Sequence, residues 1–240
     1  MATRKKPTKK VSKPKSGFTL KKFFKIIAYV VLILFVSSIV LTIAYKWINP
    51  PLTYLMVKRK LEKSYPINKE WVSIRKLPAH TYNSAIASED ANFMKHNGFD
   101  FKAIEKAKIH NEKSKRKRGA STISQQVAKN VFLWPARSWF RKGLEVYFTA
   151  LIEFFWSKER IMEVYLNVAE MGKGIYGIQA ASKHYFKKDA SKLTPQQSAL
   201  IIASLPSPLK SNPAKPSAYL FKRQAFIMKN IKMIQKLKID

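Results

Sequence analysis

The chain has 240 residues and a formal net charge of +32, because 46 Lys and Arg stand against only 14 Asp and Glu. It contains no cysteine, which excludes a disulfide framework and thiol chemistry. With 46% hydrophobic residues the chain can bury a substantial core, and its length suits one domain plus an appendage.

A membrane segment is predicted near the N-terminus. No charged residue occurs from Ile26 to Tyr45, and a run of about 20 apolar residues can cross a bilayer as a helix. Lys25 and Lys46 bracket the run, and Trp47 suits the membrane interface. A cleaved signal peptide is the alternative, but the run is long for a signal core and no convincing cleavage site follows it.

We therefore predict a basic cytoplasmic tail over residues 1–22, a transmembrane helix over 23–47 and a globular domain over 48–240. The positive-inside rule keeps the basic tail in the cytoplasm, so the domain faces the outer side of the inner (plasma) membrane. The charge alone fits nucleic acid, anionic lipid or a polyphosphate substrate. The orientation argues against nucleic acid and favours membrane phospholipid and lipid-linked pyrophosphate.

Beyond Asn49-Pro50-Pro51, which breaks the membrane helix, the sequence indicates a mostly α-helical domain. Several polar residues stand where they can cap a helix N-terminus. These predicted caps are Asn83 or Ser84 before a short helix toward Glu89, Asp100 before a helix from Phe101 to about Glu112, Ser121 before one reaching about Phe132, Ser157 before Lys158 to Asn167, and Thr194 before a helix that ends near Pro206.

Five stretches carry the chemically informative residues. They are Glu89–Gly98, Gly119–Gln126, Arg141–Glu145, Lys158–Asn167 and Gly174–Ala181. Carboxylates are scarce in this chain, so an acid that lies among small and apolar residues is conspicuous. Glu89 is such an acid, and its position suits proton transfer. The alternative is a helix-terminal carboxylate paired with a neighbouring Lys.

These stretches resemble the motifs of the peptidoglycan glycosyltransferases, glycosyltransferase family 51. The family pattern E-D-x-x-F-x-x-H-x-G is matched by Glu89, Asp90, Phe93, His96 and Gly98. The pattern G-[GA]-S-T-I-[TS]-Q-Q is matched by Gly119 to Gln126, and R-K-x-x-E by Arg141, Lys142 and Glu145. The chain is similar to the monofunctional biosynthetic transglycosylases and to the glycosyltransferase domain of class A penicillin-binding proteins.

The resemblance implies a fold and an activity for residues 48–240. The fold is mostly α, with a lysozyme-like helical lobe, a small membrane-associated lobe and one N-terminal transmembrane helix. The activity is polymerisation of glycan chains from lipid II by inverting transfer, which forms β-1,4-linked glycan and releases polyprenyl diphosphate. No Lys-Thr-Gly motif follows the glycosyltransferase motifs, so we expect no transpeptidase.

The implied reaction assigns roles to particular residues. The attacking hydroxyl is a weak nucleophile, so it needs a base, and the resemblance gives this role to Glu89. The pyrophosphate leaving group needs cations, and Glu145 is the second catalytic glutamate, which orients them. Asp90 and His96 are interpreted as structural. The predicted substrate-binding residues are Ser121, Gln125, Gln126, Lys129, Arg137, Arg141, Lys142, Asn167, Gly177 and Gln179.

Cofactors and partners follow from the same resemblance. No cofactor is strictly required, and no His or Asp cluster has metal-ligand spacing, although a divalent cation (Mg or Mn) that assists the pyrophosphate stays open. The expected partners are lipid II, the growing glycan strand and membrane phospholipid, with penicillin-binding proteins and other cell-wall synthesis proteins as protein partners.

Two other functions fit parts of the sequence. A lytic, glycan-cleaving enzyme of lysozyme-like fold would also use one glutamate, but as an acid that protonates a sugar oxygen. A non-enzymatic membrane adaptor would use the basic domain only to recruit partners. An aromatic cluster comprising Phe132, Leu133, Trp134, Trp139 and Phe140 is interpreted as an interfacial patch for polyprenyl chains, with an ordinary core as the alternative.

Overall fold

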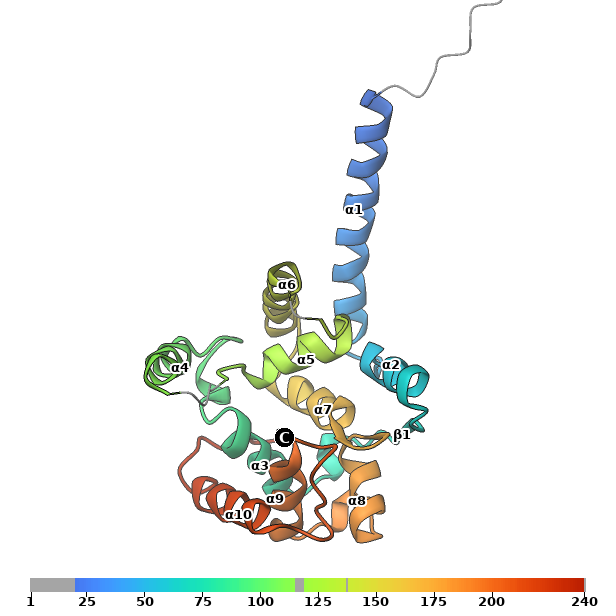
Figure 1. The fold of residues 1–240 in the computed structure, drawn as a ribbon. Coiled ribbons are helices and arrows are strands. Elements are labelled where there is room, and N and C mark those ends of the chain that lie inside the picture. Colours follow the sequence, from blue (N-terminus) through green and yellow to red (C-terminus); the bar gives the residue numbers. More distant parts are fainter. Residues whose placement is uncertain (1–19, 115–118, 137, 240) are drawn as a thin grey trace, which may run out of the picture. The chain divides into compact units, whose positions relative to one another are not determined.

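The computed structural model describes residues 20–114, 119–136 and 138–239 (Figure 1). The chain divides into two compact units, Met1–Leu41 and Thr42–Asp240. As the sequence predicts, the described chain is mostly helical.

The first helix, α1, is the one helix in the described residues that is long and apolar enough to cross a membrane. It runs from Leu20 to Ala44, with a mean hydropathy of 2.9 over its most apolar stretch. The predicted membrane segment was 23–47. The last three of those residues form a turn, in which the amides of Lys46 and Trp47 donate to the carbonyls of Ile43 (3.0 Å) and Ala44 (3.1 Å).

The Thr42–Asp240 unit contains nine further α-helices and three short strands among its described residues. The helices are α2 (Tyr54–Lys63), α3 (Ala79–Glu89), α4 (Phe101–Lys113), α5 (Ile123–Phe132), α6 (Trp139–Phe155), α7 (Lys158–Val168), α8 (Ile178–Phe186), α9 (Pro195–Ser204) and α10 (Ala218–Asn230). The strands are β1 (Asn68–Lys69), β2 (Glu170–Gly172) and β3 (Ile175–Tyr176), in the order β1-β3-β2. β3 pairs parallel with β1 and antiparallel with β2.

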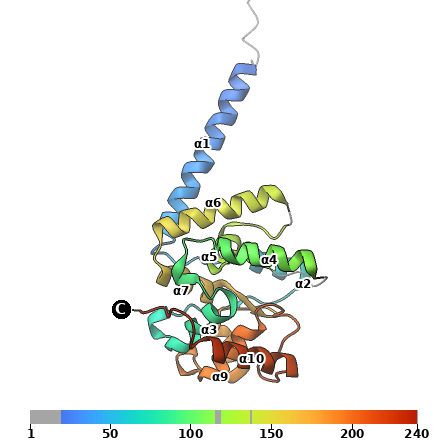
Figure 2. The same ribbon diagram turned by 90° about the vertical axis from the view of Figure 1, so that its left-hand side faces the viewer.

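The helices of this unit form two groups around α7 (Figures 1 and 2). α3 packs against α9 and α10 at one end, while α5 packs against α6 and α7 toward the other. α7 itself is almost entirely buried, and its Ile161, Val164 and Leu166 side chains are fully enclosed. This central helix gives both groups one continuous core.

Three predicted helix starts are confirmed. The side chain of Asp100 accepts from the amide of Ala103 (2.8 Å) at the start of α4. Ser157 caps α7, and Thr194 caps α9 as part of a reciprocal capping box with Gln197. Each cap satisfies amides of the first helical turn that have no partner within the helix.

Two predicted helix starts are wrong. α3 begins at Ala79, directly after Pro78, so Asn83 and Ser84 lie inside the helix rather than before it. Ser84 donates to the carbonyl of His80 (2.6 Å), one turn back, which lets a polar residue sit within a buried helix. α5 is capped by Thr122 instead of Ser121.

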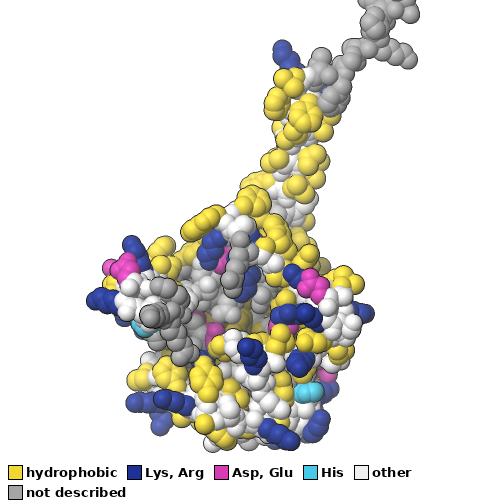
Figure 3. Space-filling view, viewed as in Figure 1, with side chains coloured by type: hydrophobic (Ala, Val, Ile, Leu, Met, Phe, Trp, Pro, Cys, Tyr) yellow, Lys and Arg dark blue, Asp and Glu magenta, His cyan; other side chains and the backbone are white. Residues whose placement is uncertain are grey.

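The exposed face of α6 is apolar. Trp139 is 91% exposed, Phe140 71% and Phe154 82%, whereas Glu145 and Ile152 on the opposite face are buried. In Figure 3, hydrophobic side chains lie where α6 is, next to Lys and Arg, and both kinds are spread over the rest of the visible face. This polarity is the reverse of that of an ordinary surface helix and is typical of a helix that meets lipid.

The predicted aromatic cluster therefore divides in two. Trp134, Trp139 and Phe140 are exposed, as a patch requires. Leu133 is buried, and Phe132 packs in the interior, where its ring stacks on that of Phe148 with centroids 4.5 Å apart. The core alternative is thus correct for these last two residues.

Candidate functional site

Glu89 is the last residue of α3, and its side chain is 16% exposed. Its Oε1 accepts a hydrogen bond from the hydroxyl of Ser88 (2.9 Å). Its Oε2 accepts from the side-chain amide of Gln126 on α5 at 3.4 Å, which is near the outer limit for such a bond. The guanidinium of Arg223 on α10 lies 3.8 Å from Oε1. The carboxylate is therefore held mainly at one of its two oxygens.

Glu89 borders a cavity of about 250 Å³. The other walls are residues 90–92, the first two turns of α4 and the 119–122 segment before α5, which includes Ser121. Ser121 is exposed toward this space, and its neighbour Thr122 caps the helix. The cavity places a candidate base and a hydroxyl side chain around a volume that can admit a polar group of a substrate.

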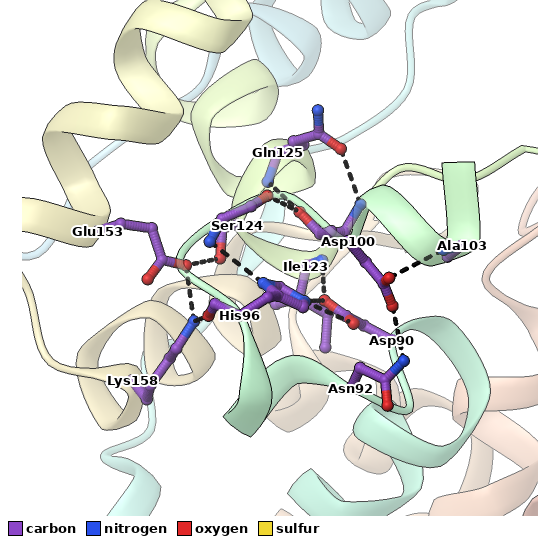
Figure 4. Close-up of polar contacts among 12 residues, drawn as sticks. Asp90, Asn92, His96, Asp100, Ala103, Ile123, Ser124, Gln125, Glu153 and Lys158 are labelled. Carbon is purple, nitrogen blue, oxygen red and sulfur yellow. Dashed lines mark hydrogen bonds and ion pairs between the residues drawn. The ribbon is translucent and has the colours of Figure 1, made fainter. Parts of the chain in front are cut away.

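Asp90, next to Glu89, is buried and joins two helices (Figure 4). Its Oδ2 accepts from the backbone amide of Ile123 (3.0 Å), at the start of α5, and its carboxylate meets Nε2 of His96 (2.9 Å). The amide of Gly98 donates to Nδ1 of His96 (3.1 Å). Nδ1 is therefore unprotonated, so the proton sits on Nε2 and is donated to Asp90. These contacts support the structural interpretation of Asp90 and His96.

A second group of side chains, from α5, α6 and α7, contacts the segment that contains His96 (Figure 4). The ammonium of Lys158 donates to the carbonyl of His96 (2.7 Å) and to Oε1 of Glu153 (2.8 Å). The hydroxyl of Ser124 donates to the same Glu153 oxygen. Sequence reasoning missed Glu153, because Glu153 and Lys158 lie on two different helices and no regular spacing links them.

A cationic cluster lies farther along α5. Glu145 on α6 is buried, and its two oxygens accept from Arg141 (2.9 Å) and Lys142 (2.5 Å). The Nε of Arg141 is also buried and has no hydrogen-bond partner among the residues that the structure describes. A buried donor of this kind can donate to a hydrogen-bond partner such as water or an anionic oxygen.

Lys129, on α5, adds a third cation. Burial lowers the pKa of its ammonium; the nearby Glu145 opposes this, and Arg141 and Lys142 lower the pKa further. Within the described part of the chain this ammonium has neither a hydrogen bond nor an ion pair. Lys129 and Arg141 line a cavity of about 450 Å³. Three cations around a single carboxylate leave this cavity positive, which suits an anionic group.

One helix joins the two cavities. Gln126, which contacts Glu89, and Lys129, which faces the cationic cluster, are three residues apart on α5 and so lie on the same side of the helix. The field of Glu89 reaches Lys129 and acts to raise its pKa. The structure thus brings Glu89, Gln126, Lys129 and the Arg141–Glu145 segment together along one face of α5.

Other predicted binding residues are used within the protein. Asn167 is fully buried: its side chain accepts from the amide of Val72 (2.8 Å) and donates to the carbonyl of Val72 (2.9 Å). Gln179 donates to Asp189 (2.8 Å) and accepts from the amide of Ala190 (2.8 Å). The side chain of Gln125 is buried in the capping box of α5, and Arg137 lies outside the described residues.

Gly177 is needed for its backbone conformation and for the close approach of a neighbouring carbonyl, and it lines neither cavity. It caps α8 with φ of +82°, and a Cβ at this position would lie 2.8 Å from the carbonyl oxygen of Asn167.

Gly177→Ala is expected to lower the free energy of unfolding by about 2 to 4 kcal/mol, because it adds strain and a backbone clash. Chemical unfolding of the detergent-solubilised chain measures this loss. Gly143→Ala is the control, since a Cβ there meets nothing within 4 Å; an equal loss in both variants would contradict the argument.

Comparison with known proteins identifies the family. Residues 57–232 match the model of the transglycosylase family. The chain is 54% identical to a protein of Bacteroides thetaiotaomicron over 90% of each chain. It is 50% identical to one of Bdellovibrio bacteriovorus over 89% of this chain and 86% of the other, and 49% identical to one of Pseudomonas putida over 82% and 86%. All three are named biosynthetic peptidoglycan transglycosylase.

The matched range includes all the residues that line the Glu89 cavity, those that line the cationic cavity except Leu55, the whole of α5 and the Arg141–Glu145 segment. This chain therefore belongs to the transglycosylase family.

Proposed function

We propose that the protein polymerises peptidoglycan glycan chains from lipid II by inverting glycosyl transfer. The observation that carries this proposal is the pairing of one accessible carboxylate with a cluster of cations across a single helix. Glu89 lies at one cavity, and Lys129 and Arg141 line the other. The family supports the substrate, because its biosynthetic members are named for peptidoglycan.

The proposed step follows from these positions. The 4-hydroxyl of the acceptor sugar loses its proton to Glu89 and forms a bond to the anomeric carbon of the donor chain. The bond from that carbon to the diphosphate breaks on the opposite face, which inverts the centre and gives a β-1,4 linkage. The departing polyprenyl diphosphate keeps the electron pair, and Lys129, Arg141 and Lys142 stabilise its charge.

The described residues offer no ready set of metal ligands. Among the described residues there is no group of three or more His, Asp or Glu side chains that could hold a metal ion. The one carboxylate in the cationic cluster, Glu145, is already engaged by Arg141 and Lys142. No step is therefore assigned to a protein-held Mg or Mn ion, and the cationic side chains stabilise the leaving group.

Membrane attachment fits a lipid-linked substrate. α1 is long and apolar enough to anchor the chain, and the exposed aromatic side chains of α6 suit contact with phospholipid or a polyprenyl chain. We place the N-terminus in the cytoplasm and the Thr42–Asp240 unit outside, as the basic tail favours. Penicillin-binding proteins are the proposed protein partners, because they use the same glycan strands.

Incubation of the detergent-solubilised full chain with labelled lipid II tests the proposal. We expect long glycan that muramidase digests to disaccharide units, with release of polyprenyl diphosphate. Shortening of preformed glycan without polymer synthesis would replace the proposal with the lytic function. A folded protein that neither lengthens nor shortens glycan would support the adaptor function.

A further inference from the structure

We propose that Arg223 is a positioning residue for the general base, holding Oε1 of Glu89 both directly and through Ser88 so that Oε2 receives the proton. This inference rests on the proposed function, because it assumes that Glu89 acts as the base. Neither Arg223 nor Ser88 belongs to the motifs by which the chain resembles its family.

The contacts form a short chain from α10 to the carboxylate. Nη2 of Arg223 donates to the hydroxyl oxygen of Ser88 (3.0 Å), and that hydroxyl donates to Oε1 of Glu89 (2.9 Å). The same Nη2 lies 3.8 Å from Oε1. One hydroxyl can accept and donate at once, so Ser88 relays the guanidinium to the carboxylate while the direct ion pair acts in parallel.

The two oxygens of Glu89 are consequently unequal. Oε1 has a hydrogen bond of 2.9 Å from Ser88 and the nearby charge of Arg223, whereas Oε2 has only the 3.4 Å contact with Gln126. An oxygen that already accepts a strong hydrogen bond is the poorer site for a new proton. Oε2 is therefore left to take the proton of the acceptor hydroxyl.

Arg223 is itself held in place. Its Nε donates to the carbonyl of Ala203 on α9 (3.1 Å), and its side chain is only 26% exposed. Beyond α10, the amide of Leu237 donates to the side-chain oxygen of Asn83 on α3 (3.2 Å). The helix that carries Arg223 and the helix that carries Glu89 are thus tied together, which makes the guanidinium a fixed rather than a mobile charge.

Several charged or titratable groups of the described residues lie near Glu89. They are Arg223 from α10, the adjacent Asp90, Asp100 and the exposed Lys106 at the α4 wall of the same cavity, and Lys129 and Tyr165, whose pKa values the Glu89 carboxylate acts to raise. Asp90 is already hydrogen-bonded to His96, and Lys129 faces the second cavity. Arg223 is the cation in ion-pair range of Glu89 among the described residues.

The test compares pH–rate profiles for lipid II polymerisation by the full chain. Arg223→Gln removes the charge, Arg223→Lys keeps it, and Ser88→Ala removes the relay without touching α10. Lys222→Gln is the matched control, because it removes an exposed cation from the adjacent position of the same helix. Thermal unfolding of each variant confirms that it is folded.

For Arg223→Gln we expect kcat to fall about tenfold with little change in KM, since in this proposal Arg223 acts on Glu89 and does not contact the substrate. The acid limb of the profile should move to higher pH, because a carboxylate without its neighbouring cation holds a proton more tightly. Arg223→Lys should restore the limb, Ser88→Ala should lower kcat by about threefold, and Lys222→Gln should match the wild type.

An unchanged acid limb in folded Arg223→Gln overturns the inference, whatever happens to the rate, because a merely structural role does not move the limb. An equal shift in Lys222→Gln overturns it as well, since the effect would then be general electrostatics. If Arg223→Gln does not fold, an unchanged kcat in Ser88→Ala or a shifted limb in Arg223→Lys overturns it. Failure of the wild type to make polymer would refute the proposed function itself. This outcome differs from a failure of the Arg223 inference, in which the wild type is active.

Discussion

Glu89→Gln is expected to lower the rate of glycan polymerisation by about 100- to 10,000-fold, which is the usual contribution of a general base. The amide has nearly the same shape and can still accept from Ser88, so the end of α3 should keep its geometry. It cannot take the proton of the acceptor hydroxyl. The measurement is the initial rate of polymer formation from labelled lipid II, with products resolved by length.

Glu62→Gln is the matched control for this variant. Glu62 lies on α2, its side chain is 53% exposed, and its ion pair with Lys58 is a surface contact at 3.6 Å. It should polymerise glycan at the wild-type rate. Substantial polymerisation by a folded Glu89→Gln protein would show that another group accepts the proton, and the assignment of the base would have to be abandoned.

Lys129→Met is expected to lower enzymatic activity without lowering the stability of the fold. We expect kcat/KM to fall by about 100- to 1,000-fold, because one of the cations assigned to the departing diphosphate is lost. The free energy of unfolding should stay the same or rise by up to about 1 kcal/mol. The physical reason is that the wild-type ammonium is partly buried beside Arg141 and Lys142, and burial and both cations lower its pKa. The chain therefore carries this charge at a cost to stability.

The pH dependence of stability gives an independent measure of that cost. Because the folded-state pKa of Lys129 is lowered from 10.5, the unfolded chain binds more protons between the lowered pKa and 10.5. Stability due to this residue therefore rises with pH across that interval and is lowest below it. The difference in unfolding free energy between the wild type and Lys129→Met should shrink as pH rises through the interval.

Lys60→Met controls for the loss of a lysine, because Lys60 is an exposed residue of α2. It should change neither activity nor the slope of stability with pH. A Lys129→Met protein with unchanged kcat/KM would remove Lys129 from the diphosphate site. A protein destabilised by several kcal/mol would show instead that the ammonium has a stabilising partner.

Local features of the fold could be predicted because their physics is local. A helix cap needs one side-chain oxygen and the amides two or three residues ahead, so Asp100, Ser157 and Thr194 mark real helix starts. A membrane-spanning helix needs only length and an apolar composition, which the stretch within α1 shows. The prediction of Ser121 as the cap of α5 was wrong because its neighbour Thr122 can cap equally well, and only the packed backbone selects Thr122.

The sequence by itself determined the family, the mostly helical fold, the candidate membrane helix and the order of the motifs, since these depend on residue type and spacing along the chain. Tertiary structure alone decided which side chains are used in contacts within the protein and which remain exposed. It turned the amides of Asn167 and Gln179 inward to the backbone, buried Leu133 and left Trp139 exposed. It also brought Arg223 to Ser88, 135 positions away, and so to Glu89. Contacts between distant residues depend on how the helices pack, and no local spacing records that packing.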